Sequence, residues 1–157
     1  MTYHAVHGHY HYLSFANALL WRSDLKGAKL GNTPVAASHK VSFCMADIRI
    51  DAWGKKGDGP RKYYAPDCLF PSARRRHRSI SSGRQQGWSD VYDWYIPDQY
   101  IEVTGVPSGL YRLEFCADPF NEIEEAREDN NCVVNHIRLS GMEGPNKQVQ
   151  VLGILKK

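Results

Sequence analysis

Long apolar runs, paired cysteine motifs and strong net charge are all missing from this sequence of 157 residues. No stretch of eighteen apolar residues is present, so no segment is expected to span a membrane. The four cysteines show no Cys-x-x-Cys spacing, which argues against a zinc ribbon or a thioredoxin motif. A net charge of +3 does not indicate a nucleic-acid partner. No basic segment followed by an apolar one opens the chain, so no signal peptide is visible.

Helical periodicity of ordinary length is missing as well, and short alternating segments separated by Gly and Pro turns take its place. The length fits a single domain over residues 1–157 with an adequate core. We therefore predict an all-β fold, a compact antiparallel β-sandwich with long irregular loops.

The alternating segments predict where the strands lie. One strand would run from the histidine-rich start through Trp21, and a second would cover residues 40–50. The alternating residues before a turn at 106–109 would form a hairpin with residues 110–117. Two more strands are expected over residues 132–139 and 147–155. Residues 51–87 show no periodicity and predict an irregular loop, whose Arg-rich insert at 74–78 favours a solvated face over an anion or nucleic-acid patch.

Residues 4–11 read His-Ala-Val-His-Gly-His-Tyr-His and contain four of the chain's seven histidines. In a strand, alternate residues face the same way, so His7, His9 and His11 would share one face while His4 has the opposite parity. A bend at Gly8 would let the three rings converge. Three imidazoles suit zinc, copper, iron or nickel. The alternative is a histidine-rich surface tract without a metal.

The four cysteines permit two disulfides with three possible connectivities. The most local pairing joins Cys44 to Cys68 and Cys116 to Cys132. The alternative is four buried free thiols. Disulfides would place the protein outside the cytosol.

Several motifs, taken in order, resemble the catalytic domain of the lysyl oxidases, copper amine oxidases that carry a quinone made from their own side chains. These motifs are His4-x-x-His7-x-His9-x-His11, residues 39–44, Gly87-x-x-Asp90-x-Tyr92, residues 100–104 and 107–111, and Asp129-Asn130-Asn131. Residues 88–94 look closer to microbial members than to animal ones. Because the first motif lies so near residue 1, we expect an N-terminally truncated member of the family. The resemblance also implies an extracellular or cell-surface location.

The resemblance implies copper ligands at His7, His9 and His11, and a lysine tyrosylquinone formed from Lys40 and Tyr92. Peptidyl lysine or another primary amine would condense with the quinone as a Schiff base. Dioxygen would be the oxidant, and the products would be an aldehyde, ammonia and hydrogen peroxide. Without the resemblance, Lys40 would be interpreted as an exposed lysine at a strand edge and Tyr92 as a core tyrosine.

Three further residue assignments depend on the same resemblance or on local chemistry. Asp90 is the candidate general base, and the alternative is a loop carboxylate that accepts hydrogen bonds from backbone N–H groups. Glu125, Asn130 and Asn131 match calcium-ligand positions of some family members, although Arg127 stands where an aspartate is expected.

Two other functions remain open. The first is a non-catalytic β-sandwich that keeps the three-histidine metal site without forming a quinone. The second, weaker one is a three-histidine oxygenase or isomerase on a cupin-like barrel, which lacks the carboxylate ligand usually found near such histidines.

Overall fold

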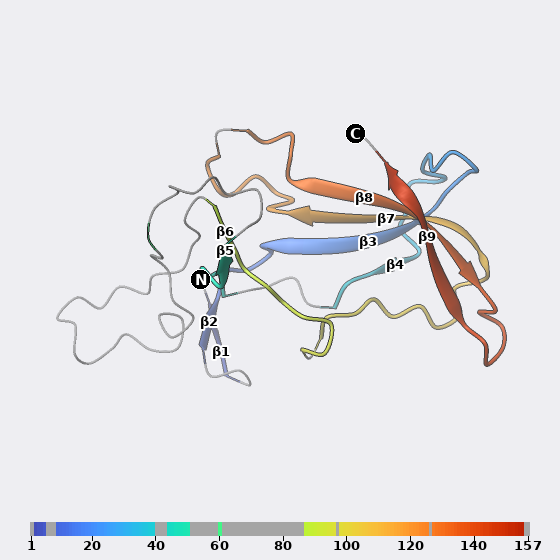
Figure 1. The fold of residues 1–157 in the computed structure, drawn as a ribbon, viewed down its shortest axis with the longest axis horizontal. Coiled ribbons are helices and arrows are strands. Elements are labelled where there is room, and N and C mark those ends of the chain that lie inside the picture. The colour runs from blue at the N-terminus through green and yellow to red at the C-terminus, as the bar shows by residue number, and fades with distance from the viewer. Residues whose placement is uncertain are drawn as a thin grey trace. The chain divides into compact units, whose positions relative to one another are not determined.

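The computed structural model describes residues 2–5, 9–39, 44–50, 60, 87–96, 98–125 and 127–155. The chain forms two compact units, unit 1 comprising Met1–Leu13 and Ser42–Ile96, and unit 2 comprising Ser14–Val41 and Pro97–Lys157. All pairings between the named strands are antiparallel, and the described residues contain no helix, which confirms the predicted all-β antiparallel fold class (Figure 1). The same residues accordingly contain no helix with the length and apolar character needed to cross a bilayer.

Unit 2 is built on a five-stranded sheet in the order β4-β3-β7-β8-β9 (Figure 1). The predicted strands at 132–139 and 147–155 are confirmed to within about one residue at each end. The strands are β3 (Ala16–Arg22), β4 (Ala36–Ala37), β7 (Gly109–Ala117), β8 (Cys132–Ser140) and β9 (Gln148–Leu155).

One face of this sheet carries a small hydrophobic core. Tyr111 lies at its centre with 0% of its surface exposed, and its hydroxyl donates to the Pro107 carbonyl at 2.6 Å. Around the ring pack Leu20, Val106, Ile137 and Leu139. Because the phenol body is buried among apolar side chains while its polar tip has a partner, Tyr111 joins the sheet to the turn before β7.

The predicted hairpin between the residues before the 106–109 turn and residues 110–117 is wrong. β7 pairs with β3 on one side and β8 on the other, so both of its edges are already occupied. Of the residues just before the turn, Ile101 forms an isolated bridge with Ser38. The alternation that predicted this strand is real, but no edge of β7 is left to receive it.

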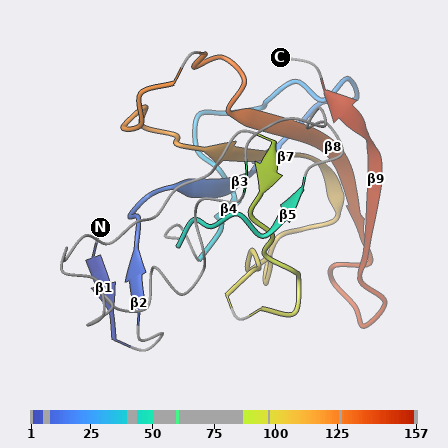
Figure 2. The same cartoon turned by 60° about the vertical axis from the view of Figure 1, so that its left-hand side comes forward.

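Unit 1 has much shorter strands. β1 (Thr2–His4) pairs with β2 (His9–His11), and β5 (Arg49–Ile50) pairs with β6 (Trp88–Ser89) (Figure 2). The predicted continuous strand from the histidines to Trp21 is therefore wrong, since β2 ends at His11 and β3 begins in the other unit. Ser14 lies between them with a φ of 55°, a left-handed conformation that no strand continues through.

The disulfide predicted between Cys116 and Cys132 is confirmed and joins directly opposed residues of β7 and β8. Cys44 is also disulfide-bonded, and no cysteine within the described ranges keeps a free thiol. The alternative of four free thiols is therefore wrong. Cys68, like the predicted loop at 51–87 except for its residues 60 and 87, lies outside the described residues.

Candidate functional site

The candidate metal ligands lie on the hairpin of unit 1. His9 and His11 occupy alternate positions of β2, positions that share a face in any strand. His11 is buried, with 2% of its surface exposed. Between β1 and β2, the rings of Tyr3 and Tyr10 meet edge to face, with centroids 5.2 Å apart, and hold the two strands together. His7 falls outside the described residues.

His4 has a different position from the one its parity predicted. The alternation of residues 4–11 predicts a single strand, in which His4 would have the opposite parity to His9 and His11. Instead the chain reverses between the two strands, and the register places His4 directly opposite His9. The parity of a single strand therefore does not apply to His4.

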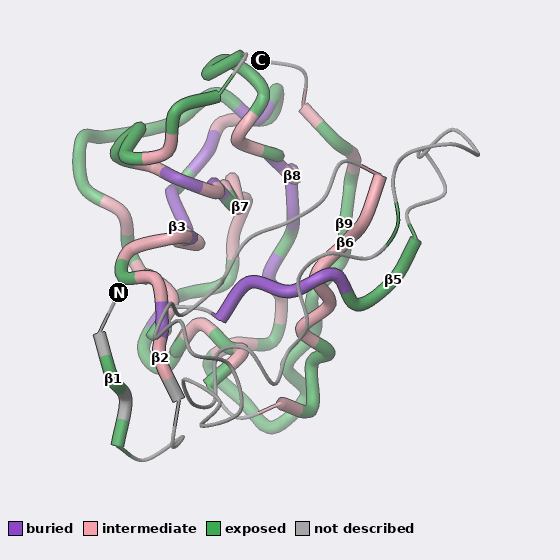
Figure 3. Tube along the Cα trace, turned by 90° about the vertical axis from the view of Figure 1, so that its left-hand side faces the viewer, coloured by how far each residue is buried: buried purple, intermediate pink, exposed green. Residues whose placement is uncertain are grey.

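The second part of unit 1 is a buried but irregular segment that precedes β5 (Figure 3). Residues 44–47 are all buried, yet they form no strand. The prediction of a strand over 40–50 is therefore wrong for residues 44–48, and β5 covers only Arg49–Ile50. Residues 40–43 lie outside the described part of the chain.

Side chains take the place of a strand partner along this segment. The Tyr92 hydroxyl donates to the Cys44 carbonyl at 2.6 Å, and the Asp90 carboxylate accepts the Ala46 N–H at 3.1 Å. Two residues after Ala46, the Ile48 N–H donates to the Ser89 carbonyl at 3.0 Å. Buried backbone groups need partners, and here two side chains from the 87–92 motif supply them. Because side chains, and not a neighbouring strand, form these hydrogen bonds, residues 44–48 are buried and have strand composition without forming a strand.

Tyr92 is therefore held in place through its phenol hydroxyl. Burial raises the pKa of the Tyr92 phenol far above its ordinary value, and the negative charge of Asp90 raises that pKa further. The phenol is consequently protonated at neutral pH, and its proton is directed at the Cys44 carbonyl.

The hydrogen bond from Ala46 gives Asp90 the structural contact that the sequence left as the alternative to catalysis. Its carboxylate ties the buried segment to the motif that carries Tyr92. The role of Asp90 as a general base stays a prediction.

Lys40 itself lies outside the described residues, but the residues that precede it are firmly anchored in unit 2. The Ser38 N–H donates to the Ala18 carbonyl at 2.8 Å, and the Ser38 hydroxyl accepts the Ala18 N–H at 3.0 Å. The His39 ring lies 5.5 Å from the Tyr100 ring, centroid to centroid. These contacts link two of the motifs behind the resemblance, residues 39–44 and 100–104. Sequence periodicity gave no sign of that contact, because it lies outside regular strands.

The predicted calcium ligands Glu125, Asn130 and Asn131 lie in the loop between β7 and β8. Arg127 pairs there with Asp129 through two hydrogen bonds, of 3.0 and 3.2 Å. The guanidinium thus supplies a positive charge at the position where the family pattern has an aspartate. Calcium binding by the three residues stays a prediction, with Arg127 as the competing cation.

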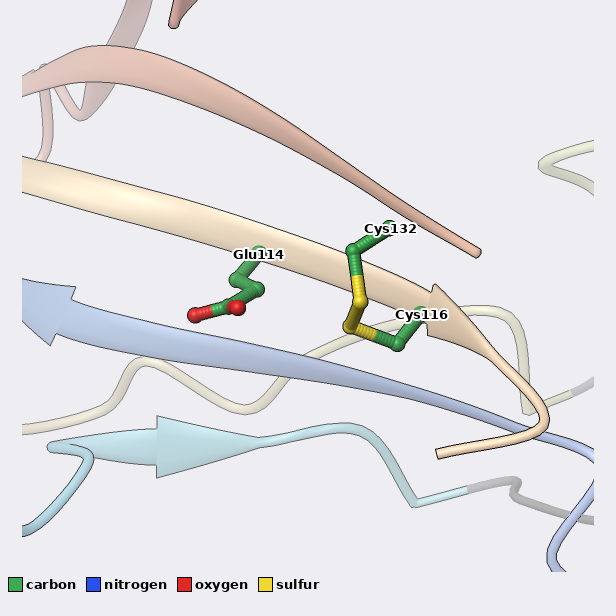
Figure 4. Close-up of side chains that lie close together, drawn as sticks. All are labelled: Glu114, Cys116 and Cys132. Carbon is green, nitrogen blue, oxygen red and sulfur yellow. A yellow bond between two sulfur atoms is a disulfide. The ribbon is translucent and has the colours of Figure 1, made fainter. Parts of the chain in front are cut away.

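A different group of potential metal ligands lies within unit 2. The ligand atoms of Glu114, Cys116 and Cys132 are within 4.8 Å of one another, the one such group of His, Cys, Asp and Glu side chains that the described ranges contain (Figure 4). Because the two sulfurs are joined in a disulfide, neither is a thiolate, and a metal requires the thiolate form. The oxidised protein therefore has no metal site here.

The fold and the site together define an all-β protein in which a histidine hairpin and a half-buried, hydrogen-bonded tyrosine belong to the same compact unit. Residues 1–148 match the family model described as Lysyl oxidase. The chain belongs to the lysyl oxidase family, a family of oxidases.

Named relatives agree with this assignment. The chain is 31% identical to Lysyl oxidase homolog 2 of Gallus gallus over 140 residues, covering 89% of this chain and 15% of the relative. It is 28% identical to Lysyl oxidase homolog 3B of Danio rerio over 143 residues, covering 89% and 15%. Protein-lysine 6-oxidase of Gallus gallus is 30% identical over 139 residues, with coverage of 88% and 28%.

The chain thus spans less than a third of the length of these curated relatives. All three are vertebrate proteins and lend no support to the expected closeness to microbial members.

Proposed function

We propose that residues 1–157 form a single copper-dependent amine oxidase domain. It would convert primary amines, either peptidyl lysine or small amines, to aldehydes with release of ammonia and hydrogen peroxide, using a quinone formed from Lys40 and Tyr92. The observation that carries this proposal is the hydrogen bond from Tyr92 to Cys44, within the same compact unit as the histidine hairpin. It brings two motifs of the family, far apart in sequence, into direct contact.

His7, His9 and His11 would hold the copper. The burial of His11 fits such a role, because a ligand screened from bulk water is oriented by its surroundings, and imidazole is a preferred ligand of copper. When bound, copper together with dioxygen supplies the oxidation of the Tyr92 ring.

The chain's own residues would contribute position and protonation state. Lys40 comes four positions before Cys44, so their Cα atoms are at most about 14 Å apart. Cys44 accepts the Tyr92 hydroxyl, so this length of chain would allow Lys40 to reach that ring. The Lys40 amine must be neutral to add to the ring, and an apolar setting beside Val41 and Phe43 would lower its pKa in that direction.

The substrate amine would bind covalently and then lose its α-proton to a base, for which Asp90 is the candidate. Its hydrogen bond with Ala46 occupies one carboxylate oxygen, Oδ2. We place the protein outside the cytosol, because the Cys116–Cys132 disulfide is typical of oxidising compartments.

The test measures hydrogen peroxide released from pentylamine and from an N-acetyl-lysine peptide by protein expressed with copper. Wild-type protein should release peroxide, whereas Tyr92→Phe and Lys40→Met should release none. The matched control is Tyr95→Phe, since Tyr95 is an exposed neighbour whose hydroxyl bonds only the side chain of Asp93 in the described structure. If wild-type protein binds copper in a one-to-one ratio but releases no peroxide, the proposal is contradicted and the non-catalytic metal-binding module is indicated.

A further inference from the structure

The face of the large sheet opposite the Tyr111 core has an unusual composition. Asn17, Leu19 and Trp21 occupy alternate positions of β3, and the register sets Asn17 against Cys116 and Leu19 against Glu114. These residues therefore share one face. Figure 4 shows Glu114 and the disulfide on the same side of the sheet. A carboxylate, an amide, an indole and a disulfide are thus brought together on a face distinct from the apolar core.

Buried polar atoms on this face lack partners. The indole N–H of Trp21 and the side-chain oxygen of Asn17 are buried without a hydrogen bond in the described structure. The Trp21 residue as a whole is only 8% exposed. Arg112 lies 3.8 Å from the Glu114 carboxylate, too far for a hydrogen bond, and its Nε is likewise buried without a partner. Buried polar groups normally have a partner, so these atoms point to a ligand or ordered water on this face. Of the three, only the Asn17 oxygen is an acceptor that could pair with an ammonium group.

A cavity of about 420 Å³ opens over Asn17 and Trp21. Its lining includes Asn17, Trp21, Glu114 and the Cys116–Cys132 disulfide, all within unit 2. The volume is within the range of small-molecule sites, and a few convergent polar groups in a partly apolar wall are what such sites contain.

The charge of the cavity wall favours a cation. Three carboxylates line it, those of Glu114, Asp118 and Glu128, against a single ammonium from Lys29. Asp118 is already used, because its carboxylate accepts the N–H groups of Glu122 and Ile123. Glu114, whose side chain is 17% exposed, has a carboxylate oxygen within 4.8 Å of the disulfide sulfurs and forms an ion pair with Arg112 at 3.8 Å.

Lys29 indicates which kind of cation fits. Its ammonium lies 3.8 Å from the centroid of the Trp21 ring, a cation–π contact inside the cavity wall. Lys29 is otherwise exposed, so its side chain can swing into solvent at little cost. The chain therefore already holds a primary alkylammonium group on this indole.

We propose that this cavity is a binding site for a primary alkylammonium group, which takes the place of the Lys29 ammonium on Trp21 and is paired by Glu114 and the Asn17 oxygen. The group comes either from a free alkylamine or from a lysine side chain of another protein. The lining of the cavity does not include Tyr92, and binding there does not depend on oxidation of the amine.

The experiment uses copper-free, full-length Tyr92→Phe protein, in which no quinone forms, so that binding is measured independently of the proposed oxidase activity. Pentylammonium is titrated while the Trp21 indole N–H resonance, assigned by its loss in Trp21→Phe, is followed by NMR. Saturable shifts are expected, and Lys29→Met should tighten binding because it removes the competing ammonium.

Glu114→Gln should weaken binding at least about ten-fold, as expected for the loss of a charged hydrogen-bond partner. Glu124→Gln is the matched control, since it removes an exposed charge outside the cavity. Circular dichroism of each variant verifies folding, and if Glu114→Gln does not fold, the comparison of Lys29→Met with the parent protein decides.

A lysyl peptide tested beside pentylammonium separates the two sources of the group. Binding of pentylammonium alone assigns the site to free amines, and binding of both extends it to protein lysines. Equal binding of neutral pentanol, no effect of Lys29→Met, or no saturable shift at all would overturn the proposal.

Discussion

The two units of this chain differ in how their buried backbone N–H and C=O groups find hydrogen-bond partners. In unit 2, β3, β7, β8 and β9 are seven to nine residues long and pair edge to edge, and β7 has a cross-strand partner on both sides. In unit 1 the strands are two or three residues long, and a buried segment relies on the side chains of Asp90 and Tyr92 for partners. The comparison teaches that regular strand pairing satisfies the backbone of unit 2, whereas an irregular buried segment holds Tyr92, the proposed quinone precursor, in unit 1.

The largest expected effect is that of Tyr92→Phe, which should abolish amine oxidation while changing the free energy of unfolding only slightly. Tyr92→Phe removes the proposed quinone precursor, so amine oxidation should fall by about a thousand-fold or more. Its stability should fall by only about 1 kcal/mol, the typical contribution of the lost hydrogen bond to Cys44. Peroxide release and urea unfolding measure the two quantities. Retention of activity would show that the reactive residue lies elsewhere.

Tyr111 should behave in the opposite way. Tyr111→Ala empties the centre of the unit 2 core and should cost about 3–5 kcal/mol of unfolding free energy. Tyr111→Phe keeps the ring and loses only the bond to Pro107, so about 1 kcal/mol is expected. Chemical denaturation of the two variants tests this difference. Equal losses would mean that the hydroxyl, and not packing of the ring, holds the sheet to the turn.

The disulfide of unit 2 should contribute next. Cys116 and Cys132 are 16 residues apart in sequence, and closing a loop of that length stabilises a protein by about 3 kcal/mol in the chain-entropy model. The double variant Cys116→Ala/Cys132→Ala should lose that amount in a denaturant titration. A loss confined to the accompanying loop, with an unchanged unfolding midpoint, would contradict a role in the global stability of the sheet.

The same contrast explains what the sequence could predict. Alternating residues gave β8 and β9 nearly to the residue, because each is a long strand of one regular sheet. Periodicity failed at residues 44–48, where partners come from side chains, and after His11, where β2 ends and the left-handed Ser14 interrupts the predicted strand to Trp21. It also failed at His4, because single-strand parity cannot anticipate a reversal of the chain.

The candidate site was predicted from motifs and not from periodicity. Nothing in the spacing of Cys44 and Tyr92 indicates a contact, and the Ser38–Ile101 bridge is equally non-local. The matched motifs of the family identified those segments as important without saying that they touch. Long-range contacts between irregular segments depend on tertiary packing, which short-range patterns do not encode.

The smallest expected effect concerns the ionisation of Tyr92. Its folded-state pKa is raised above the ordinary value of 10.0, first by burial and then by Asp90. The corresponding stability is present below pH 10 and is lost as the pH rises through the folded pKa. Asp90→Asn removes the negative charge, so the Tyr92 pKa should fall towards its ordinary value while the amide oxygen still accepts the Ala46 N–H.

Absorbance titration of copper-free protein, with Tyr92→Phe subtracted, measures that pKa. The unfolding free energy of Asp90→Asn at pH 7 should change by no more than about 1 kcal/mol, because the hydrogen bond is kept. An unchanged Tyr92 pKa in the variant would show that burial alone sets it.

The most direct test of the proposed function is peptide mass spectrometry of protein expressed with copper, dioxygen and an export signal. We expect a cross-linked fragment that contains both Lys40 and Tyr92 and is absent from Tyr92→Phe protein. Recovery of both peptides unmodified from protein with bound copper would contradict the quinone, and with it the proposed amine oxidation.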